Sequence, residues 1–593
     1  MKKTQYILTI ICIFFIISCD DYLDQPNPNA PEFPETIQDL EDTNLLINAV
    51  YNSLFHHYVL SIEENTLNSD EGSVGNRGNG GNNPLDRLVW YRHEYNSATT
   101  EVSRKWAALY RGIFIANQAI HGLELIEPTI SSQTEIDEWN KQKAEAQFFR
   151  GLYHFYLHST FNNGNIIIRD RFEADLDARN KDVSSSEEVI DFFRQDLKAA
   201  IEFLPNPSEI QEQGRITKGT ATMILANSYL YEGTDAAIET AKNLYQDLIN
   251  NFGYQLETDM AKMFTTEGEF NSESIFEVPY TIDFNVTDNA FDENSLHNRL
   301  AGRSAPFTFG GQQRFLPSSW LILEYLNEEI DPLDNRNVIQ AGNGSTTTRR
   351  VSMRASAMVA LNNDLDTRVY QSPNVLQAGN LGGGNNNFIT SLFKKYTNHD
   401  IASSEQATSS GDRNKSGKNV TINRLSEVYL NLAECYIRQN QISDALNAIN
   451  AVRSRWGLIK LGVGSPSASF DNIVYDQTTL MEHLMFFEKP LELSSEGHAI
   501  RIIDLRRWNV AQARFSDLAL RQYHPIQYDA PTGLSRGSIT SRANGTITLF
   551  DPSDPPGNLN IIYNEFEGAA TNYSINQGYL PIPEDEVNNN TAN

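Results

Sequence analysis

Hydrophobic side chains in residues 143–168 recur at helical spacing on nearly every side of the predicted helix. Phe148 and Leu152 belong to one stripe, and Tyr153 and Tyr156 to a second stripe beside it. A helix that is apolar almost all round packs between other helices and not on a surface. The same segment carries three small residues that would let neighbouring backbones come close: Ala144, Ala146 and Gly151. We therefore expect it to be the centre of a helical protein.

Segments with the same spacing follow one another through the first half of the chain. They predict helices over residues 43–55, 101–126, 136–161, 187–204, 218–231 and 235–252. The pattern returns at residue 424 with a helical hairpin, whose short loop 439–441 precedes Ser443 as N-cap and whose second helix stops at Gly457. Further helical segments are predicted at 479–487 and 497–508. Paired antiparallel helices of this kind resemble degenerate tetratricopeptide units, which stack into a solenoid.

The section 255–421 lacks this regularity and is rich in Asn, Gly, Ser and Thr. Short strands or turns are predicted at 274–278 and 388–393, and one helix at 319–327. The stretches 68–84 and 378–387 contain many glycines and asparagines, which predicts loops without regular structure. The first is either a flexible linker or a surface loop that closes over something. The predicted fold is mainly α: a tetratricopeptide-like scaffold of helical hairpins with a loop-rich elaboration of short strands.

The first residues predict a secreted, lipid-anchored protein. Lys2 and Lys3 precede a short apolar run that ends at Cys19, and this arrangement resembles a bacterial lipoprotein signal. Acylation of Cys19 would anchor the chain durably to a membrane. The acidic pair that follows Cys19 resembles the surface-export signal of Bacteroidetes lipoproteins. The only other cysteine of the mature chain is Cys435, so no internal disulfide is expected, and Cys435 is predicted to be a core residue.

These features divide the chain by composition. We predict a signal peptide at 1–18, a proline-containing lipidated tether at 19–34 and a single body at 35–593. Within the body we distinguish an N-terminal helical scaffold (35–254), a loop-rich insertion (255–421) and a C-terminal helical hairpin with a closing segment (422–593).

The charge and the missing motifs exclude several classes of function. A formal net charge of -29 argues against nucleic acid. No nucleophile elbow, zinc-protease, phosphate-loop or CxxC motif occurs, so we do not expect an enzyme, although a glycosidase-like carboxylate pair cannot be recognised from sequence. His56 and His57 point about 100° apart on a helix, and no metal site is predicted from them. The acidic stretches 288–293 and 364–366 leave a structural calcium ion open; neither has the pattern of an EF-hand.

Two stretches combine aromatic and polar residues as a sugar site requires. Sugar rings stack on flat aromatic faces, and their hydroxyls need planar polar partners. Candidate ligand-binding residues are therefore Asp70, Trp90, Tyr91, Trp320 and Arg336. The alternative for each aromatic residue is a buried anchor of a loop.

Four passages of the chain resemble the SusD/RagB family of outer-membrane nutrient-binding lipoproteins. They are residues 424–458 (RLSEVYLNLAECYIRQNQISDALNAINAVRSRWGL), 488–508 (EKPLELSSEGHAIRIIDLRRW), 579–584 (YLPIPE) and the early helices with Asn117. The chain departs from the family at Lys489-Pro490, where the family has two arginines, and at Ala499-Ile500, which precede Arg501. We expect Pro490 to end or kink its helix, and we expect these departures to affect packing more than a ligand site.

The resemblance implies a function that the residues alone do not. It implies capture of oligosaccharides at the cell surface, without catalysis, and delivery to a SusC-like TonB-dependent outer-membrane transporter. In the family the ligand site lies among loops of the first two-thirds of the chain. Two alternatives stay open: a related lipoprotein that captures peptides, and a tetratricopeptide adaptor that binds only protein. The sequence leaves the glycan undefined, including whether anionic sugars bind through arginines such as Arg336 or Arg368.

Overall fold

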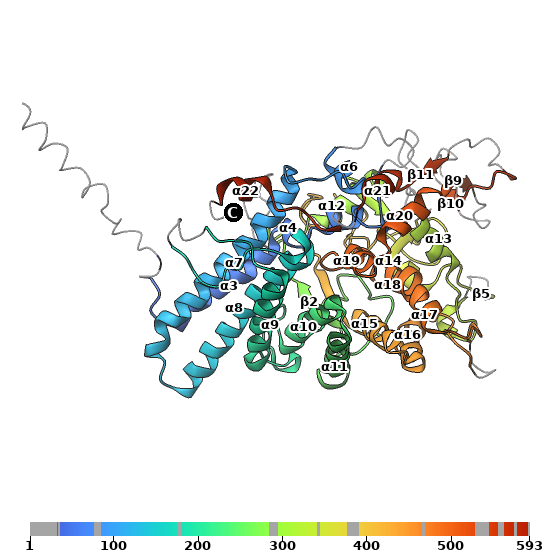
Figure 1. Ribbon diagram of the computed structural model, residues 1–593. Coiled ribbons are helices and arrows are strands. Elements are labelled where there is room, and N and C mark those ends of the chain that lie inside the picture. Colours follow the sequence, from blue (N-terminus) through green and yellow to red (C-terminus); the bar gives the residue numbers. More distant parts are fainter. Residues whose placement is uncertain are drawn as a thin grey trace, which may run out of the picture.

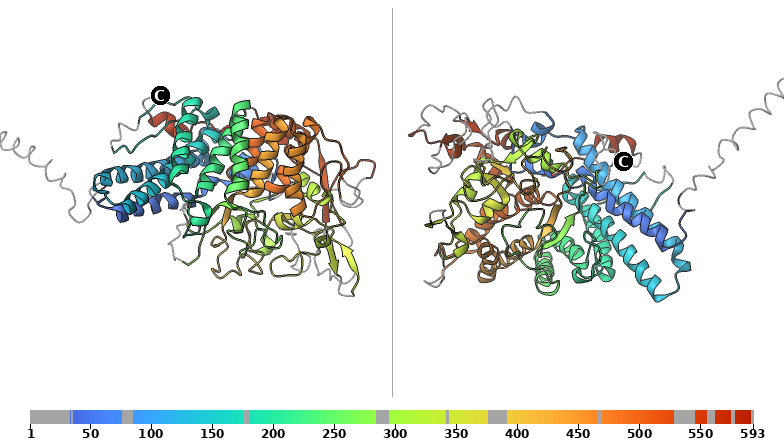
Figure 2. Two further views of the ribbon diagram at one scale, coloured as in Figure 1. Left: turned by 90° about the horizontal axis from the view of Figure 1, so that it is seen from below. Right: turned by 180° about the vertical axis from the view of Figure 1, so that it is seen from behind.

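Helical hairpins packed side by side form the larger part of the molecule, and a loop-rich part covers one side of them (Figures 1 and 2). The computed structural model describes residues 33, 36–75, 85–174, 180–283, 295–340, 344–375, 391–464, 469–527, 545–554, 562–574 and 578–590. This mainly α architecture confirms the predicted fold class.

The helices fall into three groups along the chain. The N-terminal helices are α3 (Leu40–Asn52), α4 (His57–Leu60), α5 (Ile62–Leu67), α6 (Leu85–Tyr91), α7 (Thr100–Ile126), α8 (Gln133–Thr160), α9 (Ser186–Phe203), α10 (Lys218–Glu232) and α11 (Asp235–Asn251). The middle group is α12 (Leu300–Ser304), α13 (Ser319–Asn327) and α14 (Met353–Met358). The C-terminal helices are α15 (Leu425–Arg438), α16 (Ile442–Arg455), α17 (Gln477–His483), α18 (Lys489–Leu493), α19 (Ile500–Arg507), α20 (Ala511–Ala519), α21 (Glu567–Asn572) and α22 (Glu584–Asn589).

The strands are short and pair in antiparallel fashion in five small sheets of the described residues. They are β1 (Gly72–Val74) with β3 (Phe315–Pro317), β2 (Ser274–Val278) with β8 (Val420–Arg424), β4 (Val338–Gln340) with β5 (Thr346–Thr348), β6 (Val359–Leu361) with β7 (Ser391–Phe393), and β9 (Gln522–Gln527) with both β10 (Gly545–Leu549) and β11 (Tyr563–Asn564). The β1 strand lies in a stretch for which we predicted no regular structure. That prediction is wrong for Gly72–Val74, because the partner strand comes from residues far along the chain.

Helix α8 is the centre that its hydrophobic pattern predicts. It packs against α7, α9 and α3, and Phe148, Leu152 and Tyr153 are fully buried. Close packing depends on small residues on both sides: a Cβ at Gly151 would lie 3.1 Å from the Phe193 carbonyl oxygen, and a Cβ at Gly112 of α7 would lie 2.4 Å from the Tyr153 ring. The prediction of close backbone approach is therefore confirmed for Gly151.

The helices continue in order from α8 through α9, α10, α11, α15 and α16, each packed on the next (Figure 2). The section between α11 and α15 contains the short elements, and the β2–β8 pair joins its two ends. The C-terminal hairpin has nearly the predicted bounds, but α16 begins directly after Gln441, so the prediction of Ser443 as N-cap is wrong. Gly457 follows the helix with a φ of +65°, as a helix stop requires.

Pro490 does not end its helix, because it lies in the first turn of α18, where its missing N–H is tolerated. A π-helical turn, η9 (Leu484–Glu488), connects α17 to α18 without a break. A continuing π pattern would pair an N–H at position 490 with the carbonyl of Met485, and proline has no N–H. The guanidinium of Arg501 donates to that carbonyl instead, at 2.6 Å. Arg501, which follows the departure at Ala499-Ile500, thus pairs with the carbonyl that Pro490 cannot pair with in a π pattern.

The closing segment returns to the end of α8. The backbone N–H of Leu580 donates to the Thr160 carbonyl, and the N–H of Asn162 donates to the Leu580 carbonyl. Arg506 lies over the Tyr579 ring, 3.5 Å from its centroid. These contacts tie the motif at 579–584 to the end of the central helix.

No helix in the described part of the chain has both the length and the apolar composition to cross a bilayer.

Candidate functional site

Two of the predicted site residues, Asp70 and Trp320, meet each other, but they do so inside the core. Both are almost fully buried, at 0% and 1% exposed. The Asp70 carboxylate accepts from Arg501 at 2.7 and 2.8 Å and from Arg514 at 2.9 Å, and the Arg514 guanidinium lies 4.2 Å from the centre of the Trp320 ring. These contacts lower the Asp70 pKa although burial opposes the shift. The pair joins the N-terminal segment to α19 and α20 and presents no face to a ligand.

Trp90 and Tyr91 lie in the last turn of α6, although we expected Trp90 to lie in a loop before a helix. Trp90 is 3% exposed, and its ring packs 5.1 Å from that of Tyr95. Tyr91 is half-buried, and its phenol oxygen accepts from the backbone N–H of Phe566 at 3.2 Å. The structure places Trp90 as a buried anchor and gives Tyr91 a partner from the C-terminal segment.

Arg336 is the only one of the five candidate ligand-binding residues that lines the large cavity, which Arg368 also lines, and most of its donors are already used. Its guanidinium pairs with Asp334 at 2.6 Å and donates at 2.8 Å to the carbonyls of Ser454 and Arg455. These carbonyls end α16, where a helix leaves acceptors unpaired and favours a positive charge. Arg336 therefore caps α16 and contributes to the rim of the cavity.

The remaining predictions lie partly outside the described residues. Cys19 and the acidic stretch 288–293 lie outside the residues that the structure describes. The Asp364 carboxylate accepts from the backbone N–H groups of Asp366 and Thr367 at 3.1 Å, which makes it a turn residue. Cys435 is a free, buried thiol in α15, as predicted.

The three glutamates of the motif at 488–508 lie in α18 and directly beside it, in a buried ion network. Arg424 pairs with Glu492 at 2.7 Å and with Glu496 at 2.8 Å, and Glu488 accepts from Arg453 at 2.7 Å. The network also includes Glu273, Glu328, Arg354, Lys395 and Arg455. Every carboxylate of the motif thus has a cationic partner, because an unpaired buried charge would cost several kcal/mol.

The network shifts the ionisation of its carboxylates. Arg455, Arg424 and Arg354 outweigh the effect of burial and lower the pKa of Glu492 to about 2. Arg424 and Lys395 likewise lower the pKa of Glu496 against the effect of burial. These groups are held ionised and immobile between helices. The motif therefore builds the scaffold and offers neither a general acid nor a base.

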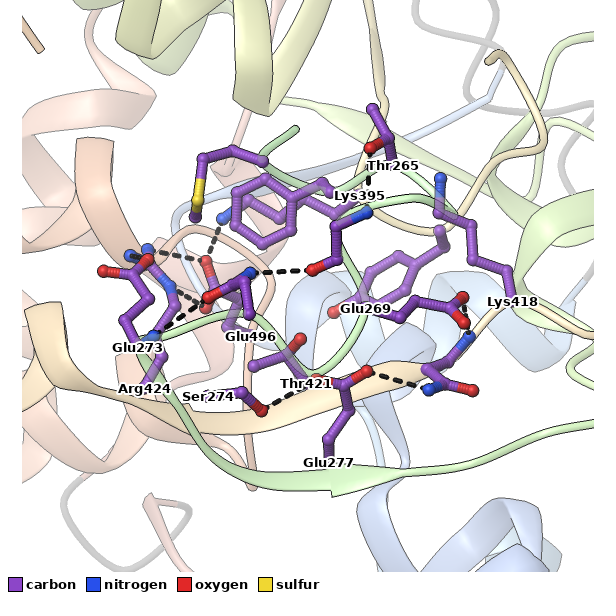
Figure 3. A pocket seen from close by; sticks show the side chains of 16 residues that line it. Thr265, Glu269, Glu273, Ser274, Glu277, Lys395, Lys418, Thr421, Arg424 and Glu496 are labelled. Atoms are coloured by element: carbon purple, nitrogen blue, oxygen red, sulfur yellow. Dashed lines mark hydrogen bonds and ion pairs between the residues drawn. The ribbon is translucent and has the colours of Figure 1, made fainter. Parts of the chain in front are cut away.

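A small enclosed cavity lies beside this network (Figure 3). Glu269 in its wall accepts from the backbone N–H of Asn419 at 2.8 Å, and Glu277 accepts from Ser274 at 2.7 Å. Burial raises the pKa of Glu269 to about 7. The space measures about 30 Å³, which holds a water molecule and not a sugar ring.

A second cavity of about 1000 Å³ lies next to the first, and the two share Met263 and Thr265. Buried residues form its floor, among them Met260, Met353, Ala357, Lys394 and His399. Exposed polar residues form its rim, among them Asp259, Arg336, Asp366 and Arg368. Its size matches an oligosaccharide. No Phe, Tyr or Trp lines it among the described residues, so the stacking platform that we predicted is absent from this wall.

Sequence reasoning missed the floor of this cavity. Lys394 and Lys395 are adjacent at the end of β7, and the apolar strand before them indicates burial, so this lysine pair was a signal that could have been used. The lysines take different roles: Lys395 joins the ion network, and Lys394 lines the cavity. Only the fold separates them.

One group of potential metal ligands occurs in the described part of the chain: His57, Glu63 and Glu64. The Arg303 guanidinium lies 2.8 Å from the His57 ring and 3.2 Å from Glu63, and Arg314 also pairs with Glu63 at 2.5 Å. These cations already neutralise the cluster. The cluster is therefore an ion network whose charges balance one another, and a guanidinium lies where a metal ion would bind.

Comparisons with known proteins agree with this architecture. A family model described as "SusD family" matches residues 272–592, and one described as "Starch-binding associating with outer membrane" matches residues 21–230. The SusD-like protein P25 of Formosa agariphila is 24% identical over 546 residues, which cover 88% of this chain and 93% of that protein.

Solved structures share the fold at low identity. A SusD superfamily protein of Bacteroides vulgatus superposes with a TM-score of 0.66 at 20% identity, over 93% of this chain and 98% of that one. The surface glycan-binding protein A of Bacteroides thetaiotaomicron, solved in complex with laminarihexaose, gives a TM-score of 0.62 at 18% identity, with the same coverage. The first family model alone matches more than half of the chain, and the chain therefore belongs to the SusD family.

Proposed function

We propose that this protein binds oligosaccharides at the cell surface and passes them to a SusC-like TonB-dependent outer-membrane transporter. The observation that carries the proposal is the cavity of about 1000 Å³ in the loop-rich part of a SusD-family chain. Ligand sites are commonly concave, with a few polar groups placed on a rigid scaffold. Here the stacked hairpins from α8 to α16 are that scaffold.

Relatives support the ligand class. The laminarihexaose complex of the Bacteroides thetaiotaomicron protein and a laminarin-binding SusD-like protein have this fold. The proposal extends binding of an oligosaccharide to this chain, and it leaves the sugar and its exact subsite to be determined from the cavity itself.

The location of the protein in the cell is part of the proposal. Acylation of Cys19 would hold the body at the outer membrane through the tether at 19–34. Attachment beside a transporter removes the need for tight binding, because a ligand that is handed on must also dissociate. An outer-membrane family description for residues 21–230 is consistent with this address.

We further propose that the protein does not cleave its ligand. The motif carboxylates Glu488, Glu492 and Glu496 are buried and paired with cations. Asp70 and Glu71 have pKa values shifted in opposite directions, and burial raises that of Glu71 to about 8. Such a pair could serve acid–base chemistry in an open site. Both side chains are, however, buried, at 0% and 2% exposed.

Affinity electrophoresis of the full-length protein across a polysaccharide panel tests the proposal, with a peptide mixture as the competing ligand. Retardation by at least one polysaccharide, without release of reducing ends, is the expected result. Retardation by none, together with binding of peptides, would favour the peptide-capturing alternative. Release of reducing ends would contradict the non-catalytic role.

A further inference from the structure

Three basic side chains at the large cavity form no ion pair within the described residues. Arg349 donates to the Arg336 carbonyl at 3.4 Å, and Arg368 donates to the Gln371 carbonyl at 2.9 Å. Lys394 donates to the Ser356 carbonyl at 2.8 Å. In a chain with a net charge of -29, a carboxylate for each would be easy to supply. None of the three has a carboxylate at ion-pair distance in the described structure, although Asp364 and Asp400 act on Lys394, and Asp366 on Arg349, from further away.

Lys394 is the most informative of them, because it is 5% exposed. An ammonium group carries three donors, and one acceptor is present for them in the described structure. Ser356 lies beside it in the cavity wall, is 4% exposed, and has a side-chain hydroxyl without a hydrogen-bond partner among the described residues. A buried cation and a buried hydroxyl left unsatisfied are costly unless a ligand completes them.

We propose that this cavity binds the anionic group of an acidic oligosaccharide, a sulfate ester or a uronate carboxylate, with Lys394 and Ser356 at the floor and Arg349 and Arg368 at the rim. This inference rests on the proposed glycan-binding function and specifies its ligand class. Arginine forms paired, charge-assisted hydrogen bonds with planar or tetrahedral oxyanions, and a buried lysine supplies a point charge.

The carboxylates that line the cavity form no ion pair with these three cations in the described part of the chain. Asp400 pairs with Lys418 at 3.2 Å and accepts from the Thr266 N–H at 2.6 Å. Asp259 accepts from the backbone N–H of Ala261 at 3.1 Å. Asp366 stays at the rim, where a carboxylate can accept from sugar hydroxyls. The described lining, without Trp, Tyr or Phe, suits a charged sugar better than a neutral one that depends on stacking.

Calorimetry with four probes tests the inference on the full-length, detergent-solubilised protein. The probes are polygalacturonate oligomers, a sulfated galactan oligosaccharide, neutral laminarin oligomers and inorganic sulfate. The variants are Lys394→Met and the double variant Arg349→Gln/Arg368→Gln. Arg111→Gln is the matched control, because Arg111 is an exposed arginine on α7 and does not line the cavity.

We expect at least one acidic oligosaccharide to bind, with an affinity that falls as salt rises. Lys394→Met and the double variant should each weaken it roughly tenfold or more, and Arg111→Gln should leave it unchanged. Unfolding temperatures measured in parallel identify any variant that has failed to fold, and the double variant at the rim keeps the test valid if Lys394→Met fails.

The outcomes separate this inference from the proposed function. Binding of laminarin alone, or acidic binding that both cavity variants retain, would overturn the anionic site and leave glycan binding intact. Inorganic sulfate binding as tightly as the sulfated oligosaccharide would reduce the cavity to a simple anion site and overturn the glycan assignment here. Binding of no saccharide at all would remove the proposed function as well.

Discussion

The ion network around α18 and the large cavity beside it both contain arginine and lysine side chains, but these side chains have different partners in the two regions. In the network, Arg424 has carboxylates from three glutamates around it. At the cavity, Arg368 and Lys394 have only backbone carbonyls as described partners. A matched buried charge holds elements together, whereas an unmatched charge in a cavity is available to a ligand. Whether an arginine is paired with a carboxylate, and not how many arginines are present, distinguishes the structural network from the proposed ligand site.

The largest effect should come from removing one cation of the network. Arg424→Met leaves Glu492 and Glu496 partly uncompensated in the core, and we expect a loss of about 3–5 kcal/mol in unfolding free energy. Arg368→Met, at the exposed rim of the cavity, should change stability by less than about 0.5 kcal/mol. Thermal or urea unfolding of both variants measures the difference. Equal losses would show that the rim arginine is also structural.

Acid should weaken the network, whereas the cavity lysine Lys394 loses its charge only at high pH. The folded pKa of Glu492, about 2, lies below its ordinary value of 4.5. Its contribution to stability is therefore complete above pH 4.5 and is lost as pH falls toward 2, by about 3 kcal/mol. The wild type and Glu492→Gln, unfolded at several pH values, should converge as pH falls. A constant difference would show that Glu492 is not held ionised.

The predicted site residue Asp70 offers a third comparison. Asp70→Asn leaves Arg501 and Arg514 without their carboxylate, and a loss of about 2–3 kcal/mol in stability is expected. Glycan affinity per folded molecule should not change, because Asp70 is buried away from the large cavity. Calorimetry below the unfolding temperature measures this. Loss of affinity without loss of stability would restore Asp70 as a ligand residue.

The smallest effect should be a pH dependence of acidic-sugar binding. Burial, reinforced by Lys418, lowers the pKa of Lys394 to about 8, while Asp364 and Asp400 oppose the shift. The ammonium is present below pH 8 and is lost above it, so affinity should fall several-fold, by about 1 kcal/mol, between pH 7 and 9. Lys394→Met should remove this dependence. A profile that is flat in the wild type would exclude Lys394 from contact with the anion.

Much of the helical scaffold could be predicted from hydrophobic spacing. The bounds predicted for α7, α10 and α13 agree with the structure to within a residue or match it, because each helix has an apolar face with a short period. The ligand-binding residues could not be predicted from the sequence in the same way. Trp90 and Trp320 have side chains of the type that stacks on sugar rings, yet both are buried in the core.

The sequence by itself determined the long helices, the buried cysteine and the family motifs, since these depend on local periodicity and on residue types a few positions apart. Only the tertiary structure decided which charges are paired. Lys394 and Lys395 are neighbours in the chain, but only Lys395 meets a carboxylate, Glu496, from a residue far away in sequence. Pairing in a core is a long-range property, and a short pattern of residues carries no information about it.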